Sequence, residues 1–544
     1  MKTSSSAPTL VLFAAISIVS LAIACGTTET KTDNDEKFTG GKRKYEEAMR
    51  SRDSQAVMTL PYAAPYDGEI APPFNTEEYE PITENEFRAA AQNPLSTFSI
   101  DVDTASYSNV RRFIARSQSP PADSVRIEEL INYFDYDYPA PGSEHPFSVT
   151  TEVSASPWSP GNRLVHIGIR GRSLDYENLR PSNLVFLVDS SGSMQSEDKL
   201  PLLKKSLGLL LGQLSSKDRV SIVAYAGSAG LVLPPTPASS RKAILAALEG
   251  LQAGGSTAGG AGIQLAYKTA KESLISGGNN RVILCTDGDF NVGVSSTGEL
   301  VRTMDEYRKT DIYLTICGFG MGNYKDGRME RISKAGNGNY FYIDGIREAE
   351  KVFVREMRAN MFTIAKDVKI QVEFNPAAVK GYRLVGYENR VMANEDFNDD
   401  LKDAGELGAG HTVTALYEII PAGSSREVRG TDPLKYQRTV PGVSSGNDEL
   451  LTLKLRYKLP GEDTSRLISS SLKDERSGLA SSSDNFRFSA AVAGFGMILR
   501  DSKHAGDLSL KNVITMARGA KGKDPQGDRA EFIRMVETCA LLKK

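Results

Sequence analysis

The sequence has few of the residues that build zinc sites, disulfide frameworks and catalytic triads. It contains four cysteines and four histidines in 544 residues, and no two cysteines form a C-x-x-C pair. The histidines are scattered and show no zinc or triad spacing. Cys285 and Cys317 lie inside apolar runs, so we expect them to be buried as small hydrophobes. A disulfide between them requires strands that bring them together, and we do not expect one.

The chain also lacks a strong charge of either sign. Its formal net charge is −3, which implies no general attraction to nucleic acid or to an anionic membrane surface. We therefore expect no nucleic-acid partner. The length is sufficient for two to four domains, and the composition is that of a globular protein with abundant glycine and a single tryptophan.

One stretch stands out, in which an apolar run ends abruptly in acid and hydroxyl groups. Leu184 to Val188 is followed by Asp189, Ser191 and Ser193. The run predicts a central parallel strand, which places Asp189 at the carboxyl edge of the sheet, where open α/β sheets bind ligands. Carboxylate and hydroxyl oxygens suit Mg²⁺, Ca²⁺ or Mn²⁺. From this pattern alone, an Asx-turn or a helix N-cap is an equally good interpretation.

Two further loops carry oxygen donors in the same succession. Thr257 lies in a glycine-rich loop, and Asp287 follows the apolar run that starts at Arg281, with Asp289 two residues later. The glycine-rich loop lacks the G-x-x-x-x-G-K-S/T pattern, so we expect no nucleotide. Strands alternate with helices and predict a doubly wound, mainly parallel α/β sheet. The expected strands are 183–189, 219–226, 281–287, 312–318 and 339–343, with a short edge strand at 231–233 ended by Pro234. The expected helices are 199–214, 240–251, 262–275, 298–309, 327–335 and 346–358.

These residues resemble the metal-ion-dependent adhesion site of von Willebrand factor A-type domains. The set is Asp189, Ser191, Ser193, Thr257 and Asp287, and the resemblance covers about residues 181–358. It implies a bound Mg²⁺, or Mn²⁺ or Ca²⁺, contacted directly by the two serines and the threonine. It also implies that the aspartates balance charge, and that an acidic side chain of a partner protein fills the open position. Asp289 lies near the rim and is a competing ligand.

No enzymatic activity follows from this resemblance. No histidine stands beside the serines, and no general base is evident. We expect a binding module rather than an enzyme. The alternatives are a structural envelope protein with a metal-stabilised loop and, third, a metal-assisted hydrolase.

The N-terminus has the features of a targeting segment. Lys2 precedes the apolar core Leu10 to Ile23, and Ala22-Ile23-Ala24 leads to Cys25. The core is shorter than the roughly 20 residues of a membrane span. The segment resembles a bacterial lipoprotein signal, although Ala22 stands where leucine is usual. We expect residues 1–24 to be removed, Cys25 to be lipidated, and the protein to reach the cell envelope. Gly26 favours, by resemblance, the outer membrane of a Gram-negative bacterium.

The flanks complete the expected organisation. We expect a flexible tether at 25–95, a folded flank at 96–180, the α/β domain at 181–358, an antiparallel β-domain at 359–483 and a helical segment at 484–544. They resemble bacterial lipoproteins that carry such a domain before a C-terminal domain of unknown function. Strands at 147–154 and 164–169 form only a hairpin, which is marginal alone, so we expect them to join the later β-domain, with the α/β domain inserted.

Two smaller expectations concern single residues. We interpret Asp101 and Asp103 as acids at a strand end and a helix N-cap rather than as a second metal site. We expect the helix at 346–358 to pack on the sheet through Ile346, Val352, Phe353 and Met357.

Overall fold

The computed structural model describes residues 76–100, 103–175, 179–255, 259–288, 297–322, 324–430 and 448–543. The expected signal peptide, Cys25 and the tether up to residue 75 lie outside these ranges, as do Asp101, Thr257 and Asp289. The described residues all belong to one structural unit. Within the described ranges, no helix has the length and apolar character that a bilayer crossing requires.

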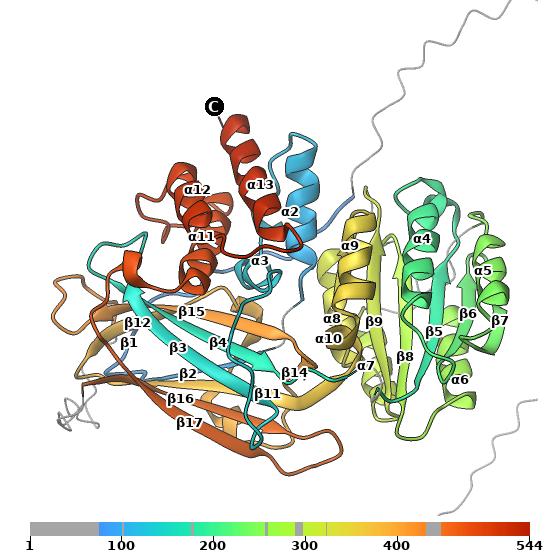
Figure 1. Ribbon diagram of the computed structural model, residues 1–544, viewed down its shortest axis with the longest axis horizontal. Coiled ribbons are helices and arrows are strands. Elements are labelled where there is room, and N and C mark those ends of the chain that lie inside the picture. Colours follow the sequence, from blue (N-terminus) through green and yellow to red (C-terminus); the bar gives the residue numbers. More distant parts are fainter. Residues whose placement is uncertain are drawn as a thin grey trace, which may run out of the picture. The chain divides into compact units, whose positions relative to one another are not determined.

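The α/β domain contains a six-stranded sheet in the order β10-β9-β8-β5-β6-β7 (Figure 1). The strands are β5 (Ser182–Asp189), β6 (Arg219–Tyr225), β7 (Ala229–Pro237), β8 (Asn279–Thr286), β9 (Ile312–Phe319) and β10 (Tyr340–Ile343). All pairs are parallel except β6 with β7. Each residue of β5 is buried, because helices cover both faces of the sheet. The predicted α/β class is confirmed.

The side chains of β5 alternate between two hydrophobic clusters. Leu184, Phe186 and Val188 pack with α4 (Leu200–Leu211) and α5 (Arg241–Glu249). Val185 and Leu187 pack with α6 (Gly259–Glu272), α7 (Thr297–Arg308) and α8 (Asp326–Ala335). The edge strand β7 runs past Pro234, where we expected it to end. Proline is tolerated there because an edge strand has one side without ladder partners.

The helix expected at 346–358 is divided into three pieces. The α-helix α9 (Ile346–Glu350) is followed by a π-helical turn, Lys351–Arg355, and by α10 (Met357–Met361). Val352, Phe353 and Met357 are buried as expected. The expectation for Ile346 was wrong: it is the first residue of α9, and its side chain is 47% exposed.

Two antiparallel sheets form a β-sandwich. Each sheet takes strands from the segments before and after the α/β domain in sequence. The first has the order β1-β12-β15-β4-β3, and the second has the order β13-β2-β11-β16-β17, with β14 paired to β11. The first-sheet strands are β1 (Arg88–Ala89), β12 (Val379–Val385), β15 (Thr412–Pro421), β4 (Arg163–Gly171) and β3 (Phe147–Ala155). The second-sheet strands are β13 (Val391–Met392), β2 (Leu95–Ser99), β11 (Thr363–Phe374), β16 (Glu449–Lys458), β17 (Arg466–Lys473) and β14 (Gly405–Gly408).

The pairing of β4 with β15 closes the sandwich around the insertion. His166 pairs with Leu416, and on the second sheet Phe98 of β2 pairs with Ile370 of β11. Both contacts join the segment before the α/β domain to the segment after it. The predicted insertion in a shared antiparallel β-domain is therefore present.

A helical layer covers the outer face of the first sheet (Figure 1). Leu164 of β4 and Leu416 of β15 share a cluster with α2, α3, α11, α12 and α13. These helices are α2 (Ala105–Ala115), α3 (Ile127–Asn132), α11 (Asp484–Leu499), α12 (Leu510–Gly519) and α13 (Asp528–Leu542). The C-terminal segment is helical, as predicted, and it packs against helices of the N-terminal flank.

The expected tether ends earlier than residue 95. Glu77 receives two hydrogen bonds from Arg112 of α2, at 2.7 and 2.8 Å, and both side chains are buried. Strand β1 pairs with β12. These contacts correct the boundary: residues 76–95 pack on the folded part, because a buried ion pair and strand pairing hold them there.

The acid expected to cap the α2 helix has a different role. Thr104 is the N-cap residue of α2 and makes no side-chain capping bond. Asp103 accepts a hydrogen bond from the backbone N–H of Tyr340 at 2.8 Å and pairs with Arg390 at 3.2 Å. Asp103 therefore joins three segments that are distant in sequence, and the N-cap interpretation was wrong for this residue.

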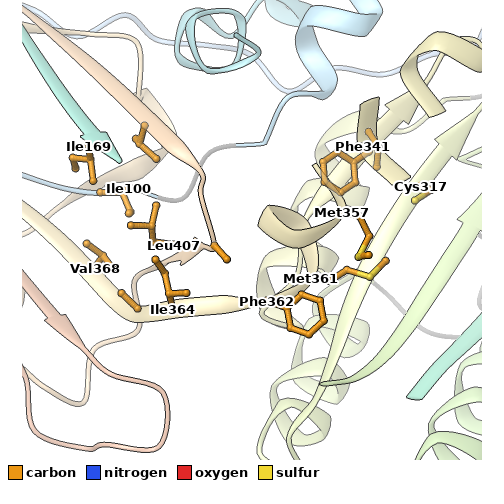
Figure 2. Close-up of a cluster of buried hydrophobic side chains, with 14 of the residues drawn as sticks. Ile100, Ile169, Cys317, Phe341, Met357, Met361, Phe362, Ile364, Val368 and Leu407 are labelled. Carbon is orange, nitrogen blue, oxygen red and sulfur yellow. The ribbon is translucent and has the colours of Figure 1, made fainter. Parts of the chain in front are cut away.

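One hydrophobic cluster runs from the sandwich to the end of the α/β domain. Figure 2 shows Ile364, Val368 and Leu407 on the sandwich side of this cluster. Phe341 and Met361 belong to the same cluster on the α/β side. The α/β domain is thus packed against the sandwich as well as joined to it by the chain.

Candidate metal centre

The described residues of the predicted site lie where the strand order of the sheet reverses. The chain runs from β5 to β6 and β7 on one side, then returns to β8 on the other side of β5. Asp189 is the last residue of β5, and Asp287 follows the last residue of β8. Because β5 and β8 are parallel neighbours, their carboxyl ends share one edge. Such a switch point leaves a crevice outside the strand ends.

Asp189 is buried and held by three hydrogen bonds. Its Oδ1 accepts from the backbone N–H of Ser191 at 2.9 Å, and its Oδ2 accepts from the hydroxyls of Tyr225 and Thr286, each at 3.1 Å. Burial raises the pKa of Asp189, the hydrogen bonds from Ser191 lower it, and the charge of Asp287 raises it further. Among the described residues, no lysine or arginine forms an ion pair with this carboxylate.

The two serine hydroxyls lie next to each other at the end of β5. Ser191 is buried and Ser193 is exposed, and their Oγ atoms are 3.0 Å apart. Ser191 is the N-cap residue of the short 3-10 helix Gly192–Gln195, but its side chain makes no capping hydrogen bond. Of the two alternative interpretations of this motif, the N-cap is absent at Ser191, whereas the Asx-turn is present, because the Ser191 N–H donates to Asp189 Oδ1.

Backbone contacts join the glycine-rich loop to the serine loop. The N–H of Gly254 donates to the carbonyl of Ser190 at 2.8 Å, and the N–H of Gly192 donates to the carbonyl of Gly255 at 3.1 Å. Gly255 has φ +80°, a conformation that favours glycine. Thr257 is two residues further along and lies outside the described residues.

Asp287 has a cationic neighbour that sequence reasoning missed. Nζ of Lys199, just before α4, donates to Oδ2 of Asp287 at 2.8 Å, and the two side chains are 9% and 0% exposed. Gly320 makes room for the lysine, because a Cβ there would lie 2.3 Å from Lys199 Cε. Tyr225 and Thr286 were also missed, although both stand at the ends of expected strands. No sequence signal pointed to Lys199.

The residues present fit a hard divalent cation. This edge of the sheet combines a buried carboxylate that lacks a cationic partner among the described residues with two neighbouring hydroxyl oxygens. These are the donors that Mg²⁺, Mn²⁺ and Ca²⁺ use. Asp189 has spare acceptor capacity, because each carboxylate oxygen carries two lone pairs.

A second acidic group is formed by Asp103, Glu129 and Glu330. Arg126 pairs with Glu129 at 3.4 Å and with Glu330 at 3.1 Å. Arg390 pairs with Asp103 and Glu330. The arginines offset the charge that would attract a metal, so this group is explained as a buried ion-pair network.

A mainly parallel sheet with these donors at its switch point is typical of von Willebrand factor type A domain proteins. Comparison with known families agrees: the model for the von Willebrand factor type A domain matches residues 183–355. A second model, described as von Willebrand factor, matches residues 73–166, and a model of the C-terminal part of the uncharacterized protein YfbK matches residues 359–542.

The chain belongs to the family of YfbK from Escherichia coli (strain K12), an uncharacterized protein. The two are 43% identical over 470 residues, which cover 85% of this chain and 81% of YfbK. The magnesium-chelatase 60 kDa subunit of Rhodobacter capsulatus is 35% identical over 139 residues, 25% of this chain and 24% of that subunit. Among solved structures, a von Willebrand factor type A protein from Catenulispora acidiphila has a TM-score of 0.41 at 15% identity, covering 74% of this chain and 98% of that one.

This family assignment indicates a broad class of function. Von Willebrand factor type A domains are mostly non-enzymatic modules for contacts between proteins, and they often bind a divalent metal. The chain is accordingly a bacterial protein of this class with a C-terminal domain of unknown function.

Proposed function

We propose that this protein captures an acidic side chain of a partner protein at a divalent-metal site formed by Asp189, Ser191, Ser193, Thr257 and Asp287. The metal is Mg²⁺ or Mn²⁺, with Ca²⁺ as the third candidate. We further propose that Cys25 carries a lipid, which holds the protein on the cell envelope, at the outer membrane of a Gram-negative bacterium.

The observation that carries the proposal is the burial of the Asp189 carboxylate without a cationic partner among the described residues. This carboxylate also accepts three hydrogen bonds. A buried charge is normally paired or coordinates a metal. The Tyr225 and Thr286 hydroxyls fix the orientation of Oδ2, so the carboxylate is held in place before a cation arrives.

Each described residue has a distinct part in this function. Asp189 and Asp287 supply negative charge, and the Ser191 and Ser193 hydroxyls supply neutral oxygen donors. When bound, the metal offers an electron-poor coordination position to a carboxylate oxygen of the partner. Ser193 is exposed, so the donor set opens toward solvent at this residue. The loop around Ser193 would therefore contact the partner and contribute to specificity.

Metal binding is tested by isothermal titration calorimetry on the full chain, with Asp189→Asn as the variant and Asp305→Asn as the control. Asp305 lies on α7, and its side chain is 41% exposed. We expect Mg²⁺ or Mn²⁺ binding in the wild type and in the control, and none in Asp189→Asn. Equal affinity in all three proteins would refute the assignment.

Partner capture is tested in envelope extracts with immobilised protein. We expect retained proteins to be released by chelator, and to be absent when Thr257→Ala protein is used. Retention that resists chelator would place the contact elsewhere on the molecule. For the anchor, Cys25→Ser should move the protein out of the membrane fraction or block its processing, whereas a cleaved Cys25→Ser protein that stays in the membrane would refute lipidation.

A further inference from the structure

A cavity of about 400 Å³ lies between the α/β domain and the sandwich, at the opposite end of β8 from Asp287. Its lining includes Arg281 near the start of β8, Asn337 and Gly338 before β10, and Asn360 of α10. The sandwich contributes Thr363 and Glu406. This volume falls within the range of small-molecule sites, about 300 to 1,000 Å³.

Arg281 is an unusual residue to find in such a lining. It is 3% exposed, and its Nη1 donates to the Thr315 hydroxyl at 2.7 Å. Its Nε has no hydrogen-bond partner, and among the described residues no carboxylate lies within ion-pair distance of the guanidinium. The Tyr313 ring lies 5.7 Å from the guanidinium carbon. Burial lowers the pKa of Arg281, and the smaller effect of the Glu406 charge raises it.

The carboxyl group whose charge acts on Arg281, that of Glu406, has hydrogen-bond partners of its own. Glu406 accepts a hydrogen bond from the Thr363 hydroxyl at 2.7 Å and one from Asn337 Nδ2 at 3.4 Å. Burial raises the pKa of Glu406 to about 7. Arg390, another cation of the lining, pairs with Asp103 and Glu330. The cavity therefore holds a buried guanidinium that forms no ion pair with a described carboxylate, although the charge of Glu406 acts on it.

We propose that this cavity binds a small anionic ligand whose carboxylate or phosphate group pairs with Arg281. A guanidinium presents its donors in a planar fork that matches two oxygens of such a group. A buried charge without a partner costs free energy, and an anion would recover that cost on binding. The amide side chains of Asn337 and Asn360 and the hydroxyl of Thr363 provide polar groups for the rest of the ligand. The site is separate from the metal centre, so either proposal can fail without the other.

The first experiment compares wild type with Arg281→Met and with the control Arg302→Met, which changes an exposed arginine on α7. The full chain is titrated with inorganic phosphate and with succinate, against chloride at matched ionic strength, and Tm and calorimetric affinity are measured. We expect at least one anion to raise Tm in wild type and control, and Arg281→Met to bind it at least about ten-fold more weakly. Which anion binds identifies the phosphate or carboxylate source.

The state of the ligand-free protein provides a second readout. Replacing a buried unpaired cation by an apolar side chain should leave the Tm of Arg281→Met, in chloride, equal to or above that of wild type. A variant that keeps its fold and loses only the anion response supports the site. An unchanged anion response in Arg281→Met, or no response of the wild type to either anion, would overturn the proposal.

Glu406→Gln should change the anion affinity in the opposite direction from Arg281→Met. The substitution removes a negative charge near Arg281 and keeps an acceptor for the Thr363 hydroxyl. At pH 8, where Glu406 is mainly ionised in the wild type, we expect the variant to bind the anion more tightly. Weaker binding by Glu406→Gln would contradict an anionic ligand at Arg281.

Discussion

Replacing Lys199 by methionine tests how the negative charge of Asp287 is balanced when no metal is bound. The ammonium of Lys199 lies 2.8 Å from Asp287 Oδ2, and both side chains are almost fully buried. Removing one partner of a buried ion pair leaves an uncompensated charge and costs about 3 to 5 kcal/mol. For a domain of this size, each kcal/mol lowers Tm by about 2 to 4 °C, so a loss of about 6 to 20 °C is expected in chelator.

The proposed metal makes the loss of Tm depend on whether a divalent cation is bound. A divalent cation beside Asp287 would replace the missing ammonium, so saturating Mg²⁺ should restore most of the Tm of Lys199→Met. The assay is thermal unfolding of wild type, Lys199→Met and the control Lys205→Met, an exposed lysine on α4, with chelator and with Mg²⁺. An equal loss of Tm under both conditions would refute the sharing of Asp287 between lysine and metal.

Three further predictions concern the sandwich and its junction with the α/β domain. Expressed alone, residues 359–544 lack β2 and β4, so we expect no cooperative thermal transition by circular dichroism, and a sharp transition would contradict the shared sheets. Gly408→Ala should lower the free energy of unfolding by about 1 to 3 kcal/mol, because the added Cβ would lie 1.8 Å from the carbonyl oxygen of Ala359. Denaturant titration measures this loss, and an unchanged denaturation midpoint would contradict the close approach. Burial raises the pKa of Glu406 to about 7, so ionising this carboxyl group costs more in the folded protein than in the unfolded chain. The free energy of unfolding should therefore fall by roughly 1 to 3 kcal/mol as pH rises from about 4.5 through 7. This fall should be absent in Glu406→Gln.

The α/β domain was predictable because its signals are local. Period and length distinguish a buried parallel strand such as Leu184 to Val188 from its flanking helices, and the acid at the strand end marks the edge of the sheet. The order of such strands along the chain is sufficient to place Asp189 and Asp287 at the same edge of the sheet. That the strands at 147–154 and 164–169 join the later β-domain was also predictable, because a lone hairpin is marginally stable, but the partner strand β15 was not predicted.

Contacts between distant segments depended on the tertiary structure. Lys199 reaches Asp287 across 88 positions of sequence, and the space for its side chain comes from the missing Cβ of Gly320. Asp103 looked like a helix cap because local hydrogen bonding is the usual role of such an acid, but packing places it against Tyr340. Arg281 appeared in the sequence only as the start of an apolar strand. Only the tertiary structure shows that its guanidinium is buried and lines a cavity shared with the sandwich. Burial and ion pairing depend on segments that are distant in sequence, so the local pattern does not predict them.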